Sequence, residues 1–121
     1  MAKFERFEDI QAWRKARGLV KEVYRVTSTG KISKDFGLSD QIRRASLSVM
    51  LNIAEGYARR TNKEFAQFLF HAHGSVAEIQ SGLYVALDLQ YISQETFNDL
   101  YQRCEEVSKM ISGLIRYLRA S

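Results

Sequence analysis

The sequence contains no proline and only seven glycines among its 121 residues. Glycine and proline mark the tight turns of β-sandwiches and barrels, and proline also interrupts helices. Their scarcity favours long helices over a turn-rich β fold. Hydrophobic residues make up 45% of the chain and charged residues 26%, which is an ordinary balance for a folded protein. We expect one domain that covers residues 1–121.

A single cysteine, Cys104, excludes an internal disulfide framework and a cysteine-cluster zinc site. No run approaches the ~18 consecutive apolar residues that a membrane-spanning helix requires. The first six residues include Lys3, Glu5 and Arg6 and lack the apolar segment of a signal peptide. We therefore expect a cytoplasmic protein that does not enter the membrane.

Signatures of catalysis and of metal binding are also missing. A di-iron bundle needs two Glu-x-x-His pairs, whereas His71 and His73 each follow a phenylalanine three positions earlier. The two histidines stand two residues apart, so they point to different sides of a helix and cannot hold one metal ion together. The sequence has neither a Gly-x-Ser-x-Gly elbow nor a phosphate-binding Gly-x-x-x-x-Gly-Lys loop. We expect no enzyme, no cofactor and no metal.

Hydrophobic periodicity predicts four helices, over residues 8–27, 39–60 and 61–90 and from residue 93 onward. Ser39 and Ser93 are candidate N-caps of the second and fourth helices, and Thr61 with Glu64 forms a candidate capping box for the third. Short connections after the second and third helices favour antiparallel neighbours. The expected fold class is all-α, an antiparallel up-down four-helix bundle.

The second predicted helix is apolar on two sides. The stripe expected to face the core contains Ile42, Ala45, Val49, Ile53 and Tyr57. The roughly opposite stripe, at ~100° per residue, contains Leu47, Leu51, Ala54 and Ala58. Because a four-helix bundle has no central helix, the second stripe predicts self-association, and Phe70 and Tyr84 on the third helix support it. The alternative is that these side chains fill gaps inside a monomer.

The positive charge lies in the first half of the chain. Residues 1–60 hold 13 Lys and Arg against 7 Asp and Glu, whereas residues 61–121 hold 5 against 7. Such an excess indicates either a nucleic-acid-binding surface or a basic surface that is simply solvated. Guanidinium groups suit phosphates because their planar fork donates two hydrogen bonds. The candidate phosphate-binding residues are Arg14, Arg17, Lys21 and Arg25 on one face of the first helix, with Arg43, Arg44, Arg59, Arg60 and Lys63 at the ends of the second.

A polar stripe that includes Asn52 and Glu55 lies between the two apolar stripes of the second helix. Glu55 precedes Arg59 by four residues, the favourable order for an ion pair within a helix. We expect Asn52 and Glu55 to form a structural polar network. The alternative is a catalytic pair, which would require a pocket with a strongly perturbed carboxylate.

Two segments carry a resemblance to a known family. Residues 41–48 read Gln-Ile-Arg-Arg-Ala-Ser-Leu-Ser, and residues 52–56 read Asn-Ile-Ala-Glu-Gly. They resemble the four-helix-bundle proteins encoded within intervening sequences of bacterial 23S ribosomal RNA genes, and the likeness extends over nearly the whole chain. That family usually has a proline in a Ser-Ile-Pro segment, where this chain has Met50 and Leu51.

The resemblance implies an antiparallel four-helix bundle that assembles as a homopentamer around a central channel. A related branch, similar in fold, is the accessory protein of diversity-generating retroelements, where a basic pentamer binds a reverse transcriptase and nucleic acid. We therefore expect a non-enzymatic oligomer that binds RNA or serves as an accessory protein of a ribonucleoprotein. The rival hypothesis is a protein–protein interaction scaffold that does not bind nucleic acid. Salt-dependent RNA binding would separate the two.

Overall fold

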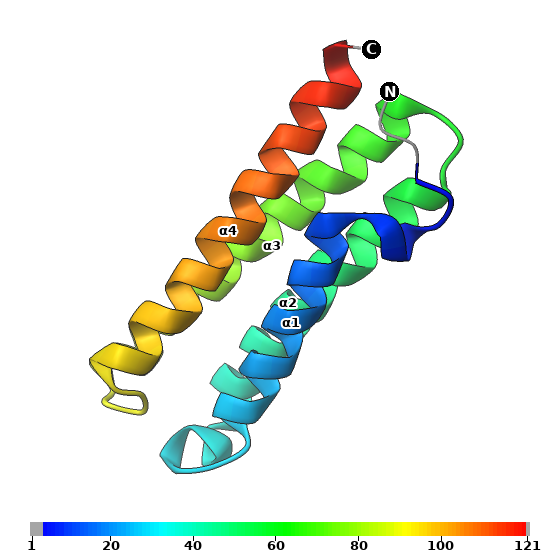
Figure 1. Ribbon diagram of the computed structural model, residues 1–121. Helices are drawn as coiled ribbons and strands as arrows, with labels where there is room; N and C mark the ends of the chain where they lie inside the picture. The colour runs from blue at the N-terminus through cyan, green and yellow to red at the C-terminus, as the bar shows by residue number, and fades with distance from the viewer. Residues whose placement is uncertain (1–3, 121) are drawn as a thin grey trace.

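Four long helices form an antiparallel bundle in the computed structural model, which describes residues 4–120 (Figure 1). The helices are α1 (Gln11–Thr27), α2 (Phe36–Ala58), α3 (Asn62–Asp88) and α4 (Gln94–Ala120). Two short 3₁₀ turns, η1 (Phe7–Asp9) and η2 (Lys31–Lys34), precede α1 and α2. The residues described contain no strand, so the all-α prediction is confirmed.

Each helix of the bundle packs against two neighbours, and none is central. α1 lies between α2 and α4, and α3 completes the square by packing against the same two helices. The α1–α2 connection and the α3–α4 turn lie together at one end, which we call the tip (residues 28–37 and 89–93) (Figure 1). Residues 59–61, which join α2 to α3, lie at the other end, which we call the base. Within residues 4–120, no helix combines the length and the apolar character that a membrane span requires.

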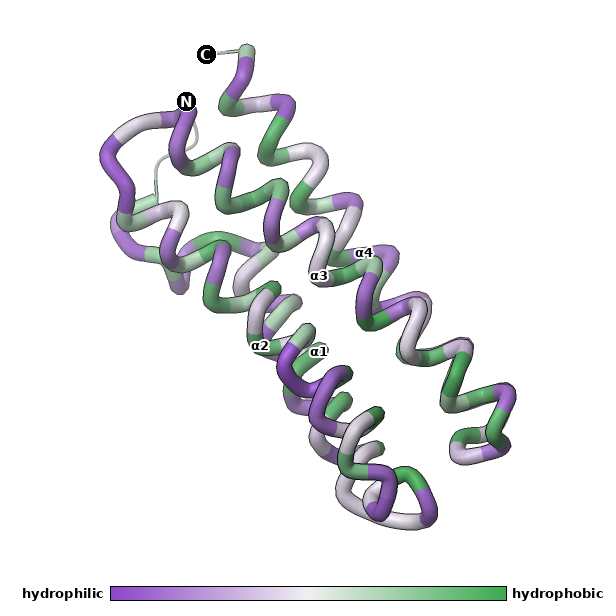
Figure 2. The backbone as a smooth tube through the Cα atoms, turned by 180° about the vertical axis from the view of Figure 1, so that it is seen from behind, coloured by the Kyte–Doolittle hydropathy of each residue, from purple (hydrophilic) through white to green (hydrophobic). Residues whose placement is uncertain are grey.

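The core consists of aliphatic side chains from all four helices. Figure 2 shows apolar and polar residues alternating along each helix. The buried apolar residues of each helix recur at helical spacing and join one core cluster. The fully buried members include Leu19, Val49, Ile79 and Ile111. Cys104 lies among them and is 0% exposed. Its burial raises the pKa of the thiol to about 12, so it packs as a small apolar side chain.

Helix starts follow the predicted caps at α3 and α4 but not at α2. The Thr61 hydroxyl accepts a 3.1 Å hydrogen bond from the Glu64 backbone N–H, and Ser93 accepts one of 3.0 Å from Thr96. The predicted N-cap Ser39 is wrong, because α2 begins three residues earlier and is capped by Asp35. Ser39 is buried inside the helix, where its hydroxyl donates to the carbonyl of Ile32 in η2.

Small shifts in register occur at the edges of two core stripes. On α1, Leu19 is buried and its neighbour Val20 is half-buried. On α4, Ile115 is buried and its neighbour Leu114 is half-buried. Sequence neighbours at the boundary of a stripe lie ~100° apart on a helix, so a slight rotation decides which one enters the core.

α2 and α3 approach each other closely near the base. Gly56 is buried, and a Cβ added there would lie 2.8 Å from Cβ of Phe68 and 3.2 Å from the carbonyl oxygen of Phe65. Atoms at such distances overlap, so only glycine fits without moving α3. The glycine of the Asn-Ile-Ala-Glu-Gly segment therefore sets the distance between these two helices.

Candidate functional site

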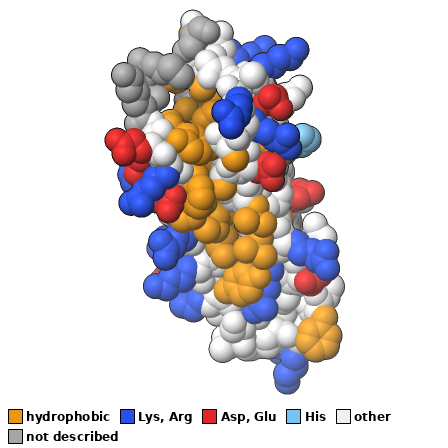
Figure 3. All heavy atoms as spheres, turned by 90° about the vertical axis from the view of Figure 1, so that its right-hand side faces the viewer, with side chains coloured by type: hydrophobic (Ala, Val, Ile, Leu, Met, Phe, Trp, Pro, Cys, Tyr) orange, Lys and Arg blue, Asp and Glu red, His pale blue; other side chains and the backbone are white. Residues whose placement is uncertain are grey.

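Three residues of the second apolar stripe of α2 lie outside the core, and the fourth, Ala54, packs against the edge of the core. Leu51 is 60% exposed, Ala58 is exposed, and Leu47 and Ala54 are half-buried. Figure 3 views the side of the bundle on which α1 and α2 lie and shows a continuous band of apolar side chains with charged groups on both flanks. We call Leu47, Leu51, Ala54 and Ala58 the α2 patch. Its role in self-association stays a prediction.

The aromatic residues of α3 that were predicted for the same interface contact side chains of α4. The ring of Tyr84, 50% exposed, lies 4.9 Å from that of Phe97 and 5.9 Å from that of Tyr101, both on α4. Phe70 is 52% exposed and lies 5.8 Å from the guanidinium of Arg119, also on α4. We call Phe70 and Tyr84 the α3–α4 patch. Both contact α4, and Phe70 also lines a cleft with Ser48 and Asn52 of α2.

Three basic residues of α1 are exposed and keep their charge available to solvent. Arg14 donates a 3.1 Å hydrogen bond to the carbonyl of Glu8, and the Arg17 guanidinium lies 5.9 Å from the centre of the Trp13 ring. Across residues 4–120, neither arginine nor Lys21 has a carboxylate partner within ion-pair distance. We call Arg14, Arg17 and Lys21 the α1 basic stripe.

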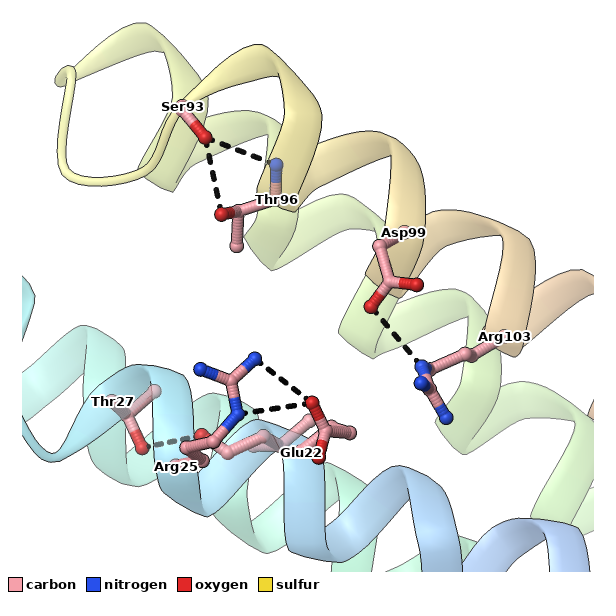
Figure 4. A network of polar contacts seen from close by, with 8 residues as sticks. Glu22, Arg25, Thr27, Ser93, Thr96, Asp99 and Arg103 are labelled. Atoms are coloured by element: carbon pink, nitrogen blue, oxygen red, sulfur yellow. Dashed lines mark hydrogen bonds and ion pairs between the residues drawn. The ribbon is translucent and has the colours of Figure 1, made fainter.

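Arg25, the fourth residue predicted for this stripe, is directed toward Glu22. Its Nε and Nη2 donate hydrogen bonds of 3.0 and 2.9 Å to one carboxylate oxygen of Glu22. The hydrogen bonds with Arg25 hold the pKa of the Glu22 carboxyl below its ordinary value. Figure 4 shows this pair pointing into the gap between α1 and α4, where Asp99 and Arg103 form a second ion pair. The positive charge of Arg25 is thus partly compensated.

Arg43 is a structural link between α2 and α1. Its Nε donates a 2.7 Å hydrogen bond to the Thr27 hydroxyl, and its Nη2 donates one of 3.2 Å to Ser28. The guanidinium also lies 4.5 Å from the centre of the Tyr24 ring, a cation–π distance. These contacts direct the arginine toward the end of α1.

Two of the remaining predicted arginines form local ion pairs, and two basic residues do not. Arg44 pairs with Asp40 at 2.8 Å. Arg59 pairs with Glu55 at 3.2 Å, as the spacing predicted, and reaches Glu64 at 3.9 Å. Arg60 and Lys63, both exposed near the base, form no ion pair with any residue in the described part of the chain.

The polar network of α2 includes Asn52 but is centred on two serines. The Asn52 amide donates to the carbonyl and the hydroxyl of Ser48, at 2.8 and 3.0 Å. The hydroxyl of Ser75, on α3, donates to that of Ser48 at 2.9 Å. Glu55 instead pairs with Arg59, and no hydrogen bond joins it to Asn52 among the residues that the structure describes. Sequence reasoning missed Ser75, because nothing in the pattern of α3 marks it as the partner of Ser48.

The histidines lie apart, as their spacing predicted. His73 Nε2 lies 2.9 Å from the Ser108 hydroxyl of α4, whereas His71 is exposed beside Phe68. Over residues 4–120, no group of three His, Cys, Asp or Glu side chains converges on a site that could hold a metal ion.

Comparison with protein families identifies the family to which the chain belongs. The family described as 23S rRNA-intervening sequence protein matches residues 8–113, from η1 into the last turns of α4. The chain belongs to this family. The matched region of this 23S rRNA-intervening sequence protein contains the α1 basic stripe and both apolar patches.

A solved structure from Bacteroides thetaiotaomicron has the same fold. It is described as a protein of unknown function from the S23 ribosomal protein family. It is 21% identical to this 23S rRNA-intervening sequence protein and superposes with a TM-score of 0.78, over 86% of this chain and 97% of the other. Curated proteins with an assigned role yielded no match.

Proposed function

We propose that this 23S rRNA-intervening sequence protein is a non-catalytic, self-associating protein that binds RNA through the α1 basic stripe. The observation that carries the proposal is the set of three exposed cations, Arg14, Arg17 and Lys21, on one helix without carboxylate partners. A cation that already pairs with a carboxylate gains little from a phosphate, whereas a free one releases the counterions that the phosphate had held.

The spacing of the α1 basic stripe suits a nucleic-acid backbone. Arg14 and Lys21 are seven residues apart, which places them roughly 10 Å apart along the helix axis at 1.5 Å per residue. One strand of B-form DNA advances ~3.4 Å along the duplex axis per phosphate, so a stripe aligned with such an axis spans about three phosphates. Contacts of this kind are independent of sequence and attract any RNA of suitable shape.

The two apolar patches support assembly into a ring. The α2 patch is aliphatic and lies on α2, whereas the α3–α4 patch is aromatic and lies on α3 in contact with α4. Contact between unlike patches of successive copies is heterologous, and such contacts close into rings when the rotation allows. We propose a homopentamer, as the family resemblance implies. A ring repeats the α1 basic stripe in every copy, and linked sites raise the effective concentration for one RNA.

The experiment that tests RNA binding is a charge reversal with a matched charge-conserving control. Arg17→Glu with Lys21→Glu is compared with Arg17→Lys with Lys21→Arg, using fluorescence anisotropy of a structured RNA hairpin at several salt concentrations. The reversal should weaken binding several-fold and lower the salt slope by about two, one unit per lost phosphate contact. The control should bind as the wild type does. The proposal is overturned if the wild type binds no RNA at ~50 mM salt, where phosphate attraction is strong.

A second candidate function is a protein–protein interaction scaffold. The observation that favours it is the exposure of large apolar side chains, with Leu51 at 60% and Phe70 at 52%. Another protein, such as the reverse transcriptase that the family's retroelement branch binds, would cover these side chains. A wild-type protein that is monomeric and fails to bind RNA would support this scaffold function.

A further inference from the structure

Phe36 is the most exposed large apolar side chain among the residues described, at 79%. It is the first residue of α2 and lies at the tip, two residues after the end of η2. A phenylalanine ring in water loses the hydrophobic free energy that burial would supply, so nothing in the fold of one protomer explains its position. The ring is held on a structured segment, because Asp35 caps α2 through a 3.1 Å hydrogen bond from the Leu38 N–H.

Two clefts meet at Phe36. The first, about 640 Å³, is lined on its other sides by hydroxyl groups and by Arg43. Its hydroxyl-bearing residues are Thr27, Ser28, Ser33 and Ser39. The second, about 650 Å³, is lined by Lys31, Lys34, Asp35 and Tyr91. Both clefts share Phe36 and Gly37, and both volumes fall within the ~300–1,000 Å³ of ligand pockets. The ring is therefore accessible from two sides.

The charge around this ring is positive. Lys31 and Lys34 are exposed, and neither is paired with a carboxylate within residues 4–120. Of the two carboxylates that line the clefts, Asp40 pairs with Arg44 at 2.8 Å, whereas Asp35 keeps its negative charge and accepts a 3.1 Å hydrogen bond from the Tyr91 hydroxyl. Lys31, Lys34 and Arg43 outnumber these two carboxylates among the residues that line the clefts. An anion that approaches Phe36 thus meets free cations.

We propose that Phe36 stacks on an unpaired base of a bound RNA, with Lys31 and Lys34 holding the flanking phosphates. The proposal rests on the RNA binding proposed above and assigns the tip a preference for single-stranded RNA. An aromatic ring beside cations is the arrangement that single-strand-binding proteins use, since every base offers a π-face and every nucleotide a phosphate. The four hydroxyl groups of the first cleft each donate to a backbone carbonyl, so what they can offer to base amino groups and to the ribose 2′-OH is acceptor oxygens.

The surroundings of Phe36 favour a base over a protein or a membrane. The centre of a protein interface is a contiguous apolar surface, whereas the walls of these clefts are hydroxyls and charges. A membrane-binding tip would present several apolar side chains together, whereas Phe36 is the one aliphatic or phenylalanine side chain among the residues that line the two clefts. Leu89, also at the tip and 51% exposed, lines neither cleft. A flat ring among polar groups matches a nucleobase.

The tip continues the proposed RNA path. The α1 basic stripe runs along α1 toward Thr27 and Ser28, which line the first cleft next to Phe36. An RNA whose paired part lies on the α1 basic stripe can place its unpaired end in the clefts. The stripe then supplies attraction, and the tip distinguishes unpaired from paired RNA.

The test compares three substitutions of Phe36 on two RNAs. The probes are a hairpin with a single-stranded tail that carries 2-aminopurine and a blunt duplex of the same length. Phe36→Ala should weaken binding of the tailed RNA roughly fivefold or more, the loss of one base–aromatic stack, and leave duplex binding unchanged. Phe36→Trp should retain tailed-RNA binding, whereas Phe36→Leu should behave as Phe36→Ala because it keeps apolar size without a π-face.

A fluorescence signal separates this proposal from RNA binding in general. Stacking quenches 2-aminopurine, so wild type and Phe36→Trp should quench the tail and the other two variants should not. If wild type binds both RNAs but Phe36→Ala binds the tail equally well, the stacking proposal fails and the α1 basic stripe stands. If Phe36→Leu keeps wild-type affinity and quenching, the ring is not a stacking platform. Absence of any RNA binding by wild type overturns both proposals.

Discussion

Arg43 Nε donates a 2.7 Å hydrogen bond to the hydroxyl of Thr27, sixteen residues earlier in the chain. Thr27 is only 3% exposed, and its hydroxyl in turn donates a 2.7 Å hydrogen bond to the carbonyl of Val23. The arginine therefore stabilises the end of α1 from α2. A residue that the sequence marks as a candidate for phosphate contact is used to join two helices.

Removing this link should destabilise the bundle more than removing the neighbouring arginine. Arg43→Ala loses two hydrogen bonds and the contact with Tyr24, so we expect the free energy of unfolding to fall by about 1–3 kcal/mol. Arg44→Ala loses one exposed ion pair within α2, worth about 0.3–0.5 kcal/mol. Urea denaturation followed by the fluorescence of Trp13 measures both. Equal losses would contradict the structural role of Arg43.

Two glycine-to-alanine substitutions should have opposite effects. Gly56→Ala places a Cβ 2.8 Å from that of Phe68, so α3 must move, and we expect a loss of about 1–3 kcal/mol. Gly18→Ala has nothing within 4 Å and replaces a flexible residue inside α1, so it should gain up to about 1 kcal/mol. Thermal unfolding of the two variants checks the sign of each change. A neutral Gly56→Ala would show that α2 and α3 are not in close contact at the base.

The role of the α2 patch in self-association is tested by comparing a carboxylate introduced on the patch with one introduced in the core. Leu51→Glu should lower the molar mass in light scattering and leave the protomer helical, because Leu51 is 60% exposed in one copy. Val49→Glu should unfold the protomer, because Val49 is 0% exposed and an unpaired buried carboxylate costs several kcal/mol. A wild-type protein whose molar mass equals that of one protomer would contradict the proposed self-association.

Stability should decline in mildly alkaline solution because of Cys104. Burial raises the pKa of this thiol to about 12 in the folded protein, whereas in the unfolded chain it is about 8.5. Above the lower value the unfolded state loses its proton first, so the free energy of unfolding falls as pH rises. The loss should reach about 2 kcal/mol by pH 10, and the decline continues until the folded thiol also ionises.

The control for this pH dependence is Cys104→Ala, which removes the thiol but keeps every tyrosine and lysine. The difference in unfolding free energy between the two proteins should shrink as the pH rises from 7 to 10. In the native wild type, Cys104 should also resist thiol reagents and react only after denaturation. A constant difference across this pH range would show that the thiol ionises equally in both states.

The helices and most of their ends could be predicted from neighbouring residues. The Thr61 and Ser93 caps and the alternation of Phe97, Leu100 and Cys104 depend on contacts within one or two helical turns. The Glu55–Arg59 pair is also local and was predicted. The start of α2 was missed because two residues, Asp35 and Ser39, both have capping side chains, and the turn η2 decides which one is used.

The positions of charge and exposure depended on residues far apart in the sequence. Arg43 meets Thr27 sixteen residues away, and Ser48 meets Ser75 twenty-seven residues away. The second apolar stripe of α2 was recognisable from periodicity, yet the contacts of Phe70 and Tyr84 with α4 follow from how α3 packs on α4. The sequence alone determined four amphipathic helices, because periodicity and capping act within a few residues. Only the tertiary structure decided which cations are left free and which aromatic ring faces solvent, because packing brings their partners together.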